Sequence, residues 1–144
     1  MAESRATREN LGFLLAKASQ RWNELLYERF RRAGYADVRP AYGSILLPLF
    51  EEDGLRMGEI ARRARLSKQT LTTLVRLMER NDLVLRVRDP DDGRAFRIFL
   101  SERSRAFRPV VEETLSELDD VVALHIATRD RAALERGLKG VMAL

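Results

Sequence analysis

The 144-residue chain contains no cysteine and a single histidine, His125. Without cysteine the chain can form neither disulfides nor thiolate metal sites, and it cannot sense redox state through a thiol. A lone histidine, with no second histidine or cysteine to join it, is a poor basis for a metal site or for a set of acid, base and nucleophile. We therefore expect no metal, no cofactor and no enzymatic activity.

Long apolar runs are also absent from the sequence. The longest, residues 45–50, contains Pro48 and is far shorter than the roughly 20 residues that span a bilayer as a helix. Residues 1–10 are polar and charged, without the apolar core of a secretory signal. Together with the lack of cysteine, these features fit a cytoplasmic protein.

Aromatic residues are sparse at 7%, whereas hydrophobic residues make up 45% and charged residues 33% of the chain. This composition is that of a globular protein, and the length suits one domain with a substantial core. Few aromatics and many charges favour amphipathic helices over a sandwich of sheets.

The net charge of +4 is unevenly distributed along the chain. Residues 54–108 hold 14 Lys and Arg against 7 Asp and Glu, whereas residues 1–53 are neutral and residues 109–144 carry −3. A basic block between neutral and acidic flanks is typical of a surface that binds a polyanion. On charge alone, a solvated charged face explains the block equally well.

Apolar residues at spacings of three and four predict that most of the chain is helical. Two stretches between residues 83 and 100 instead alternate apolar and polar side chains around a turn-rich segment, which predicts a β-hairpin. We expect helices over residues 8–32, 40–53, 57–64, 67–80, from 101 and from 128 to about 144, and strands over 83–88 and 94–100. In the first strand, one face should carry Leu83, Leu85 and Val87 and the other Val84, Arg86 and Arg88.

Several residues suggest where these helices begin or bend. Ser67, Ser101 and Thr128 stand where N-caps are expected. Pro40 is suited to the first turn of its helix, and Pro48 should kink or shorten the same helix.

The two short helices are separated only by Arg65 and Leu66 and are followed at once by the basic hairpin. This order predicts a winged helix-turn-helix. The major groove of DNA admits one α-helix, and the outer face of residues 67–80 has no acid before Glu79, whereas ordinary surface helices mix acids and bases. We predict that this face contacts bases and phosphates through Ser67, Lys68, Gln69, Thr70, Thr72, Thr73 and Arg76.

The hairpin tip suggests a second contact with DNA. Arg94 follows the tight turn and can reach a minor groove or phosphates, while Asp92 can hold the loop or pair with Arg94. Arg86 and Arg88 either add phosphate contacts or form salt bridges with Asp89 or Asp91.

Five segments of the sequence resemble the helix-turn-helix and wing of the MarR family of transcriptional regulators. They are MGEIA at residues 57–61, LSKQTLT at 66–72, DLV at 82–84, DPDDGRA at 89–95 and LSE at 100–102. The specific match covers about residues 55–102, and the flanking helices agree in order and length. The sequence departs from the usual pattern at Asp82, where glycine is common, and at Ser101, Ser104 and Pro48.

The resemblance implies a mainly α fold with a small β-hairpin wing. Residues 37–100 would form the winged DNA-binding lobe, and residues 1–36 and 101–144 would form a helical dimerisation region. A homodimer would read a pseudo-palindromic site on double-stranded DNA, with residues 67–80 in the major groove and the wing, 88–97, at the minor groove. The family resemblance also implies a repressor or activator, more often a repressor, that responds to a small molecule.

Two alternatives stay open at this point. Trp22 and Tyr42 could bind an aromatic effector, although packing in the core or in a dimer is a more common use of such side chains. The winged lobe could also serve as a protein-interaction module without DNA binding, its basic region facing an acidic partner. The acid-free outer face of residues 67–80 favours DNA.

Overall fold

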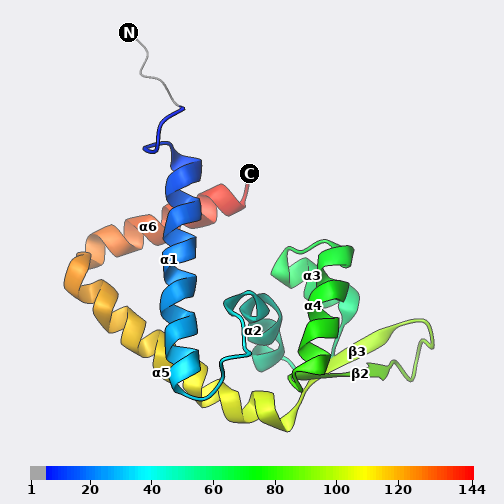
Figure 1. The fold of residues 1–144 in the computed structure, drawn as a ribbon. Coiled ribbons are helices and arrows are strands. Elements are labelled where there is room, and N and C mark those ends of the chain that lie inside the picture. The colour runs from blue at the N-terminus through cyan, green and yellow to red at the C-terminus, as the bar shows by residue number, and fades with distance from the viewer. Residues whose placement is uncertain (1–5) are drawn as a thin grey trace. The chain divides into compact units, whose positions relative to one another are not determined.

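The computed structural model describes residues 6–144, which form six α-helices, one short 3₁₀ helix and a three-stranded sheet (Figure 1). The chain divides into two compact units, Met1–Val110 and Val111–Leu144. In order, the elements are α1 Leu11–Arg32, η1 Pro40–Tyr42, α2 Gly43–Glu51, β1 Leu55–Arg56, α3 Met57–Ala64, α4 Lys68–Arg80, β2 Val84–Arg88, β3 Phe96–Leu100, α5 Glu102–His125 and α6 Thr128–Met142.

The predicted winged fold with mainly helical content is confirmed. Helices α3 and α4 have the predicted boundaries, with Ser67 as the N-cap of α4. Helix α1 begins three residues later than predicted, at Leu11, because the Asn10 side chain caps it by accepting a hydrogen bond from the Phe13 amide.

The second helix is shorter than the predicted residues 40–53. Residues 40–42 form a 3₁₀ turn before α2, with Pro40 at its start. Helix α2 then runs through Pro48 to Glu51, so the proline does not end it. The face that carries Ile45 and Leu49 is buried, and this packing compensates for the hydrogen bond that proline removes.

The sheet has the antiparallel order β1-β3-β2, and its short first strand was not predicted. The register pairs Val84 with Leu100 and Arg86 with Ile98. Consequently Val84, not Leu85, lies on the face with the core residues of β3. The alternation predicted for this strand is found, because Arg86 and Arg88 share the face of Val84. Leu85 and Val87 lie on the other face and are 53% and 47% exposed.

The core of the first unit lies between the helices and the inner face of the sheet. Helix α3 contacts both α2 and α4, and the three helices lie against β2 and β3 (Figure 1). Apolar side chains from all of these elements are buried. Among the most deeply buried are Ile45, Leu49, Ile60, Leu71, Val75, Met78, Leu83 and Ile98. This packing fixes α4 through its apolar face and leaves its opposite face in solvent.

An aromatic cluster joins the two ends of the first unit's sequence. Phe107, in the first turns of α5, is fully buried, packing edge-on against Phe30 of α1 at 4.8 Å between ring centroids. Tyr35 stacks on the same ring at 4.5 Å. The start of α5 is thereby anchored to the end of α1.

The second unit contains the rest of α5 and all of α6. Arg131 of α6 pairs with Asp119 of α5 at 2.9 Å and with Glu135 at 3.0 Å. The prediction that Thr128 caps α6 is wrong, because the N-cap is Ala127, which makes no side-chain capping bond. No residue of α6 is buried, and Leu134, Leu138, Val141 and Met142 stand exposed.

Candidate nucleic-acid interface

The turn between α3 and α4 sets the direction of α4. Helix α3 ends where Arg65 adopts a left-handed conformation (φ 55°), and the Leu66 amide donates back to the Ala61 carbonyl. Two residues later the Ser67 hydroxyl accepts a hydrogen bond from the Thr70 amide at 3.1 Å. Arg65 is itself exposed, and the pattern of apolar residues gave no sign of its unusual backbone.

The outer face of α4 is polar and free of acids until Glu79. Thr72 and Thr73 donate their hydroxyl protons to the carbonyls of Lys68 and Gln69, at 2.8 and 3.1 Å. Their oxygens therefore remain available as acceptors, for example for an amino group on a base edge. Of the predicted contacts on α4, Thr72 is half-buried, and the exposed ones are Ser67, Lys68, Gln69, Thr70, Thr73 and Arg76.

The hairpin turn is held by Asp92. Its carboxylate accepts a hydrogen bond from the Arg94 amide at 3.0 Å, and its carbonyl accepts one from the Ala95 amide. Arg94 itself is exposed. The turn thus fixes the backbone beside Arg94 while its side chain remains free to reach out from the wing.

Asp89 links the wing to the rest of the sheet in a way that the sequence did not reveal. Its side chain is fully buried and accepts hydrogen bonds from Arg56 of β1 at 2.7 Å and Arg97 of β3 at 3.1 Å. The Asp91 amide donates to the same carboxylate, and these contacts hold the pKa of Asp89 below its usual value despite its burial. The alternative partners predicted for Asp89, Arg86 and Arg88, are therefore wrong.

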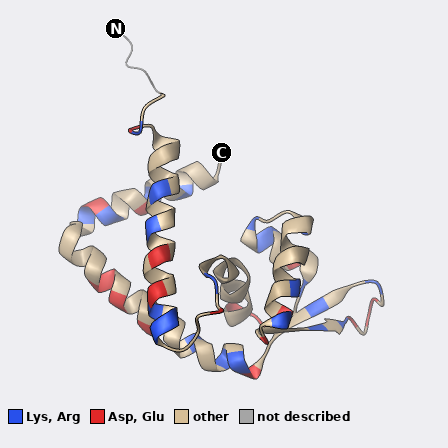
Figure 2. Ribbon diagram, viewed as in Figure 1, with Lys and Arg blue, Asp and Glu red and all other residues tan. Residues whose placement is uncertain are grey.

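Arg86 and Arg88 instead lie on the opposite face of the sheet. Arg86 is 3.5 Å from Glu79 at the end of α4, and both guanidinium groups lie over the ring of Phe96. Both arginines are exposed. Basic side chains run along both strands of the hairpin, while acidic residues gather at its turn (Figure 2).

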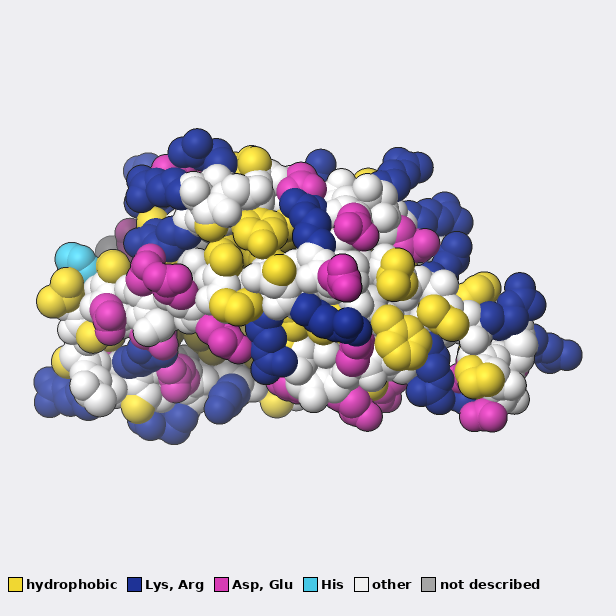
Figure 3. Space-filling view, turned by 90° about the horizontal axis from the view of Figure 1, so that it is seen from below, with side chains coloured by type: hydrophobic (Ala, Val, Ile, Leu, Met, Phe, Trp, Pro, Cys, Tyr) yellow, Lys and Arg dark blue, Asp and Glu magenta, His cyan; other side chains and the backbone are white. Residues whose placement is uncertain are grey.

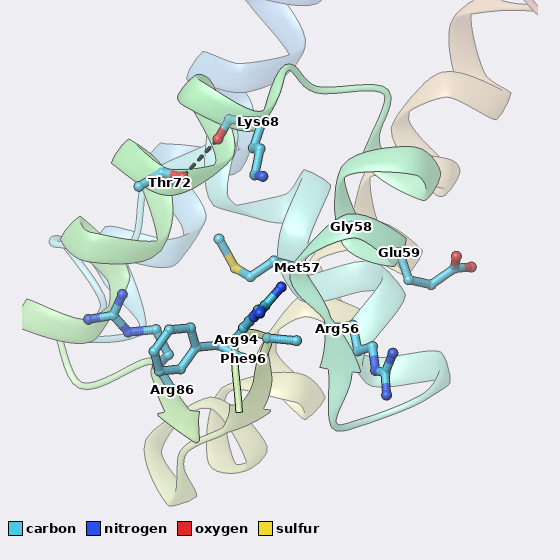
Figure 4. Close-up of a pocket in the computed structure, with 10 residues that line it drawn as sticks. Arg56, Met57, Gly58, Glu59, Lys68, Thr72, Arg86, Arg94 and Phe96 are labelled. Atoms are coloured by element: carbon cyan, nitrogen blue, oxygen red, sulfur yellow. Dashed lines mark hydrogen bonds between the residues drawn. The ribbon is translucent and has the colours of Figure 1, made fainter. Parts of the chain in front are cut away.

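A hollow of about 560 Å³ separates α4 from the wing (Figure 4). Lys68 and Thr72 of α4 form one wall, Arg86, Arg94, Ala95 and Phe96 of the hairpin form another, and residues 56–59 close it. In the close-up, Lys68 and Arg94 extend into the space beside Met57, while Glu59 points away from it. Of the predicted contacts, Lys68 and Thr72 of the helix and Arg94 of the wing thus meet around one basic hollow. The others, Ser67, Gln69, Thr70, Thr73, Arg76 and Arg88, do not line it.

Glu59, the one acid that lines the hollow, is ionised and already paired with two arginines. Arg62 and Arg63 donate hydrogen bonds to its carboxylate, which lowers its pKa to about 2. Its charge is therefore taken up by neighbours on α3, and the hollow retains a positive balance.

Trp22 and Tyr42 lie outside this hollow. Tyr42 is 1% exposed, and its hydroxyl accepts a hydrogen bond from Asn81 at 3.3 Å, so it forms part of the core. Trp22 is half-buried on α1. Over residues 6–144, no cluster of His, Cys, Asp and Glu could hold a metal ion, and no helix is long and apolar enough to cross a membrane.

Comparison with known proteins agrees with this architecture. The MarR family model matches residues 40–96. YsmB of Bacillus subtilis, an uncharacterized transcriptional regulator of the helix-turn-helix type, is 30% identical over 114 residues, which cover 78% of this chain and 73% of YsmB. The chain belongs to the MarR family.

A further relative and a solved structure of the same fold overlap with this MarR-family chain to different degrees. TtmR of Methylorubrum extorquens, also a transcriptional regulator of the helix-turn-helix type, is 41% identical over 64 residues. The match covers 44% of this chain, which spans only a third of the length of TtmR. The Staphylococcus aureus MepR–DNA complex superposes with a TM-score of 0.78 at 18% identity, over 93% of this chain and 96% of MepR.

Proposed function

We propose that this chain is a transcriptional regulator of the MarR type that binds a specific sequence in double-stranded DNA. Helix α4 would enter the major groove, and the hairpin tip with Arg94 would reach the minor groove. The observation that carries the proposal is the acid-free outer face of α4, from which Lys68 and Thr72 line one basic hollow together with Arg94 of the wing. Side chains of this face can read base edges, and the surrounding cations can neutralise phosphates.

The family assignment supports this function. The relatives that match the chain are transcriptional regulators of the helix-turn-helix type, and MepR, which shares the fold, was solved on DNA. A regulator of this kind acts where the DNA is, so we propose that the chain works in the cytoplasm and without enzymatic activity.

We propose further that the chain functions as a homodimer on a pseudo-palindromic site. Exposed apolar residues support this assembly in each unit separately. Leu11 and Leu14 of α1 are 61% and 47% exposed, and α6 leaves four apolar side chains uncovered. A second copy would remove such faces from water. By function, residues 1–36 and 101–144 would then belong to dimerisation and residues 37–100 to DNA binding.

Repression and control by a small effector are the finer parts of the proposal, and they rest on the family resemblance. Of the two aromatic residues suggested for an effector, Trp22 is the better candidate, because the Tyr42 hydroxyl is already bonded within the core. An aromatic effector would contact the exposed part of Trp22 and change its fluorescence.

Selection from a pool of random duplex DNA tests the proposed function. We expect the wild-type protein to enrich one sequence with two related halves, as a two-fold symmetric dimer requires. Arg94→Ala should weaken binding to the selected duplex at least fivefold and lower the salt slope by about 0.9, the value of one phosphate contact. Arg129→Ala, which removes an exposed arginine of α6, is the matched control and should change neither quantity.

Failure to enrich any sequence would contradict the regulator and favour the protein-interaction module. In that case, none of the duplexes should displace an acidic protein partner from the chain. The affinity for that partner should fall in Arg94→Ala and stay unchanged in the Arg129→Ala control.

A further inference from the structure

Two arginines of β2 share one aromatic ring of β3. The register sets Arg88 directly opposite Phe96, and Arg86 opposite Ile98 on the same face of the sheet. The guanidinium carbon of Arg86 is 4.9 Å from the centroid of the Phe96 ring, and that of Arg88 is 5.6 Å from it. Both distances lie within the range of cation–π attraction.

Beyond the ring, the two cations differ in what holds them. Arg86 also forms an ion pair with Glu79 at 3.5 Å, while Arg88 makes no ion pair with any residue in the described part of the chain. Asp89, the acid next in sequence, faces the other side of the sheet and is occupied by Arg56 and Arg97. Two like charges at alternate positions of one strand repel each other, so the ring is the main contact that keeps them together.

Phe96 contributes less to the core than its neighbours on the same face. Ile98 is completely buried and Leu100 is 6% exposed, whereas Phe96 is half-buried and lines the hollow between α4 and the hairpin. In the close-up, the Phe96 ring and the Arg86 side chain lie side by side at the wall of this hollow (Figure 4). The aromatic ring is therefore placed to support charges at the hollow and adds little to the core.

The hollow has a defined place relative to bound DNA, on the assumption that the proposed function is correct. A ridge of sugar and phosphate separates the major groove from the minor groove of the same duplex. With α4 in the first groove and the tip of the wing in the second, that ridge must cross between them, which is where the hollow lies. Lys68, Arg86 and Arg94 line it from three different elements.

We propose that this hollow seats the phosphate ridge of the DNA, and that Phe96 is the positioning residue that holds Arg86 and Arg88 ready for its phosphates. The ring fixes two long side chains before DNA arrives, which lowers the entropy lost when they bind. Without the ring, only the ion pair with Glu79 would hold Arg86, and Arg88 would move freely in solvent.

A double-mutant cycle on the selected duplex tests the proposal. Phe96→Leu keeps an apolar side chain and removes the aromatic face, and we expect about a tenfold loss of affinity near 0.15 M salt. In the Arg86→Ala/Arg88→Ala background the same substitution should change affinity less than twofold, because no cation remains to be held. That double variant should also lower the salt slope by up to about 1.8. Phe96→Tyr should retain wild-type binding.

The opposite results are equally specific. An equal loss from Phe96→Leu in both backgrounds would overturn the proposal, since Phe96 would then act through packing alone, and so would wild-type affinity in Phe96→Leu. Thermal unfolding of each variant checks the fold, and Phe96→Met replaces Phe96→Leu if the latter unfolds early. If the wild-type protein selects no duplex, the regulator function fails. If it selects one and Arg94→Ala weakens it, only the role of Phe96 is in question.

Discussion

Ser67 offers a test in which stability and DNA binding change in opposite directions. Its hydroxyl accepts a hydrogen bond from the Thr70 amide at 3.1 Å and caps the 13-residue helix α4, and its side chain is exposed beside the face proposed to meet DNA. Ser67→Ala removes the cap and should lower the free energy of unfolding by about 1 kcal/mol. Ser67→Asp keeps a good cap and adds a negative charge at the positive end of the helix, which should stabilise it by roughly 0.3–1 kcal/mol.

The same aspartate should weaken DNA binding strongly. A carboxylate about 4 Å from a phosphate is repelled by roughly 1 kcal/mol in bulk water and about 4 kcal/mol at the effective dielectric of a protein surface. Affinity for the selected duplex should therefore fall at least fivefold while urea denaturation shows undiminished stability. Asn10→Asp is the matched control, because Asn10 caps α1 through the Phe13 amide at 2.9 Å. If Ser67→Asp bound DNA as tightly as Asn10→Asp does, Ser67 would not face phosphates.

Three further predictions concern stability. Gly54→Ala should destabilise the fold by about 2–4 kcal/mol, because Gly54 has φ +72° and a Cβ there would lie 2.7 Å from the Phe99 ring. Gly58→Ala is the control: its Cβ meets no atom within 4 Å, so the substitution should be neutral or stabilising. Urea denaturation compares the two variants. Asp82 follows the C-cap of α4 with φ 54°, a conformation that favours glycine. Asp82→Gly should therefore raise the free energy of unfolding by about 0.5 kcal/mol, and Asp82→Val should lower it. Equal urea midpoints for the wild-type protein and both variants would contradict this. The pKa of Glu59 is lowered to about 2 in the folded chain, so the free energy of unfolding should fall as the pH drops from 4.5 towards 2. The urea midpoint of Glu59→Gln should change less over that interval than the midpoint of the wild-type protein.

Helices α3 and α4 could be predicted because their signals are local. Apolar residues at helical spacing and a capping serine lie within the segment that they specify, and α3 and α4 accordingly have the predicted bounds. The polar outer face of α4 was also visible, since burying Leu71, Val75 and Met78 determines which side chains point outward.

The sheet was harder to predict because its contacts are distant in sequence. Leu85 and Val87 look like core residues in the strand pattern, but pairing with β3 turns them to the exposed face. Exposed hydrophobic side chains are visible among charged ones at the hairpin end of the first unit (Figure 3). A two-residue strand such as β1 has no periodicity of its own to detect.

The same reason explains why the supporting residues of the wing were missed. Arg56 and Asp89 are 33 positions apart, and no pattern in either segment predicts their contact. Phe96 follows the alternation expected of a strand residue, and its contact with Arg86 and Arg88 becomes visible only once the register is known. The residues proposed to contact DNA were thus visible in the sequence, whereas those proposed to position them became visible only in the fold.

The most direct test of the central claim is the ratio of two affinities measured under the same conditions. The wild-type protein is titrated into the selected duplex and into a scrambled duplex of equal length and composition, from 50 to 300 mM salt. A specific regulator should bind the selected duplex at least about 1,000-fold more tightly near physiological salt, with affinity for both falling steeply as salt rises. A ratio near one at every salt concentration would contradict it.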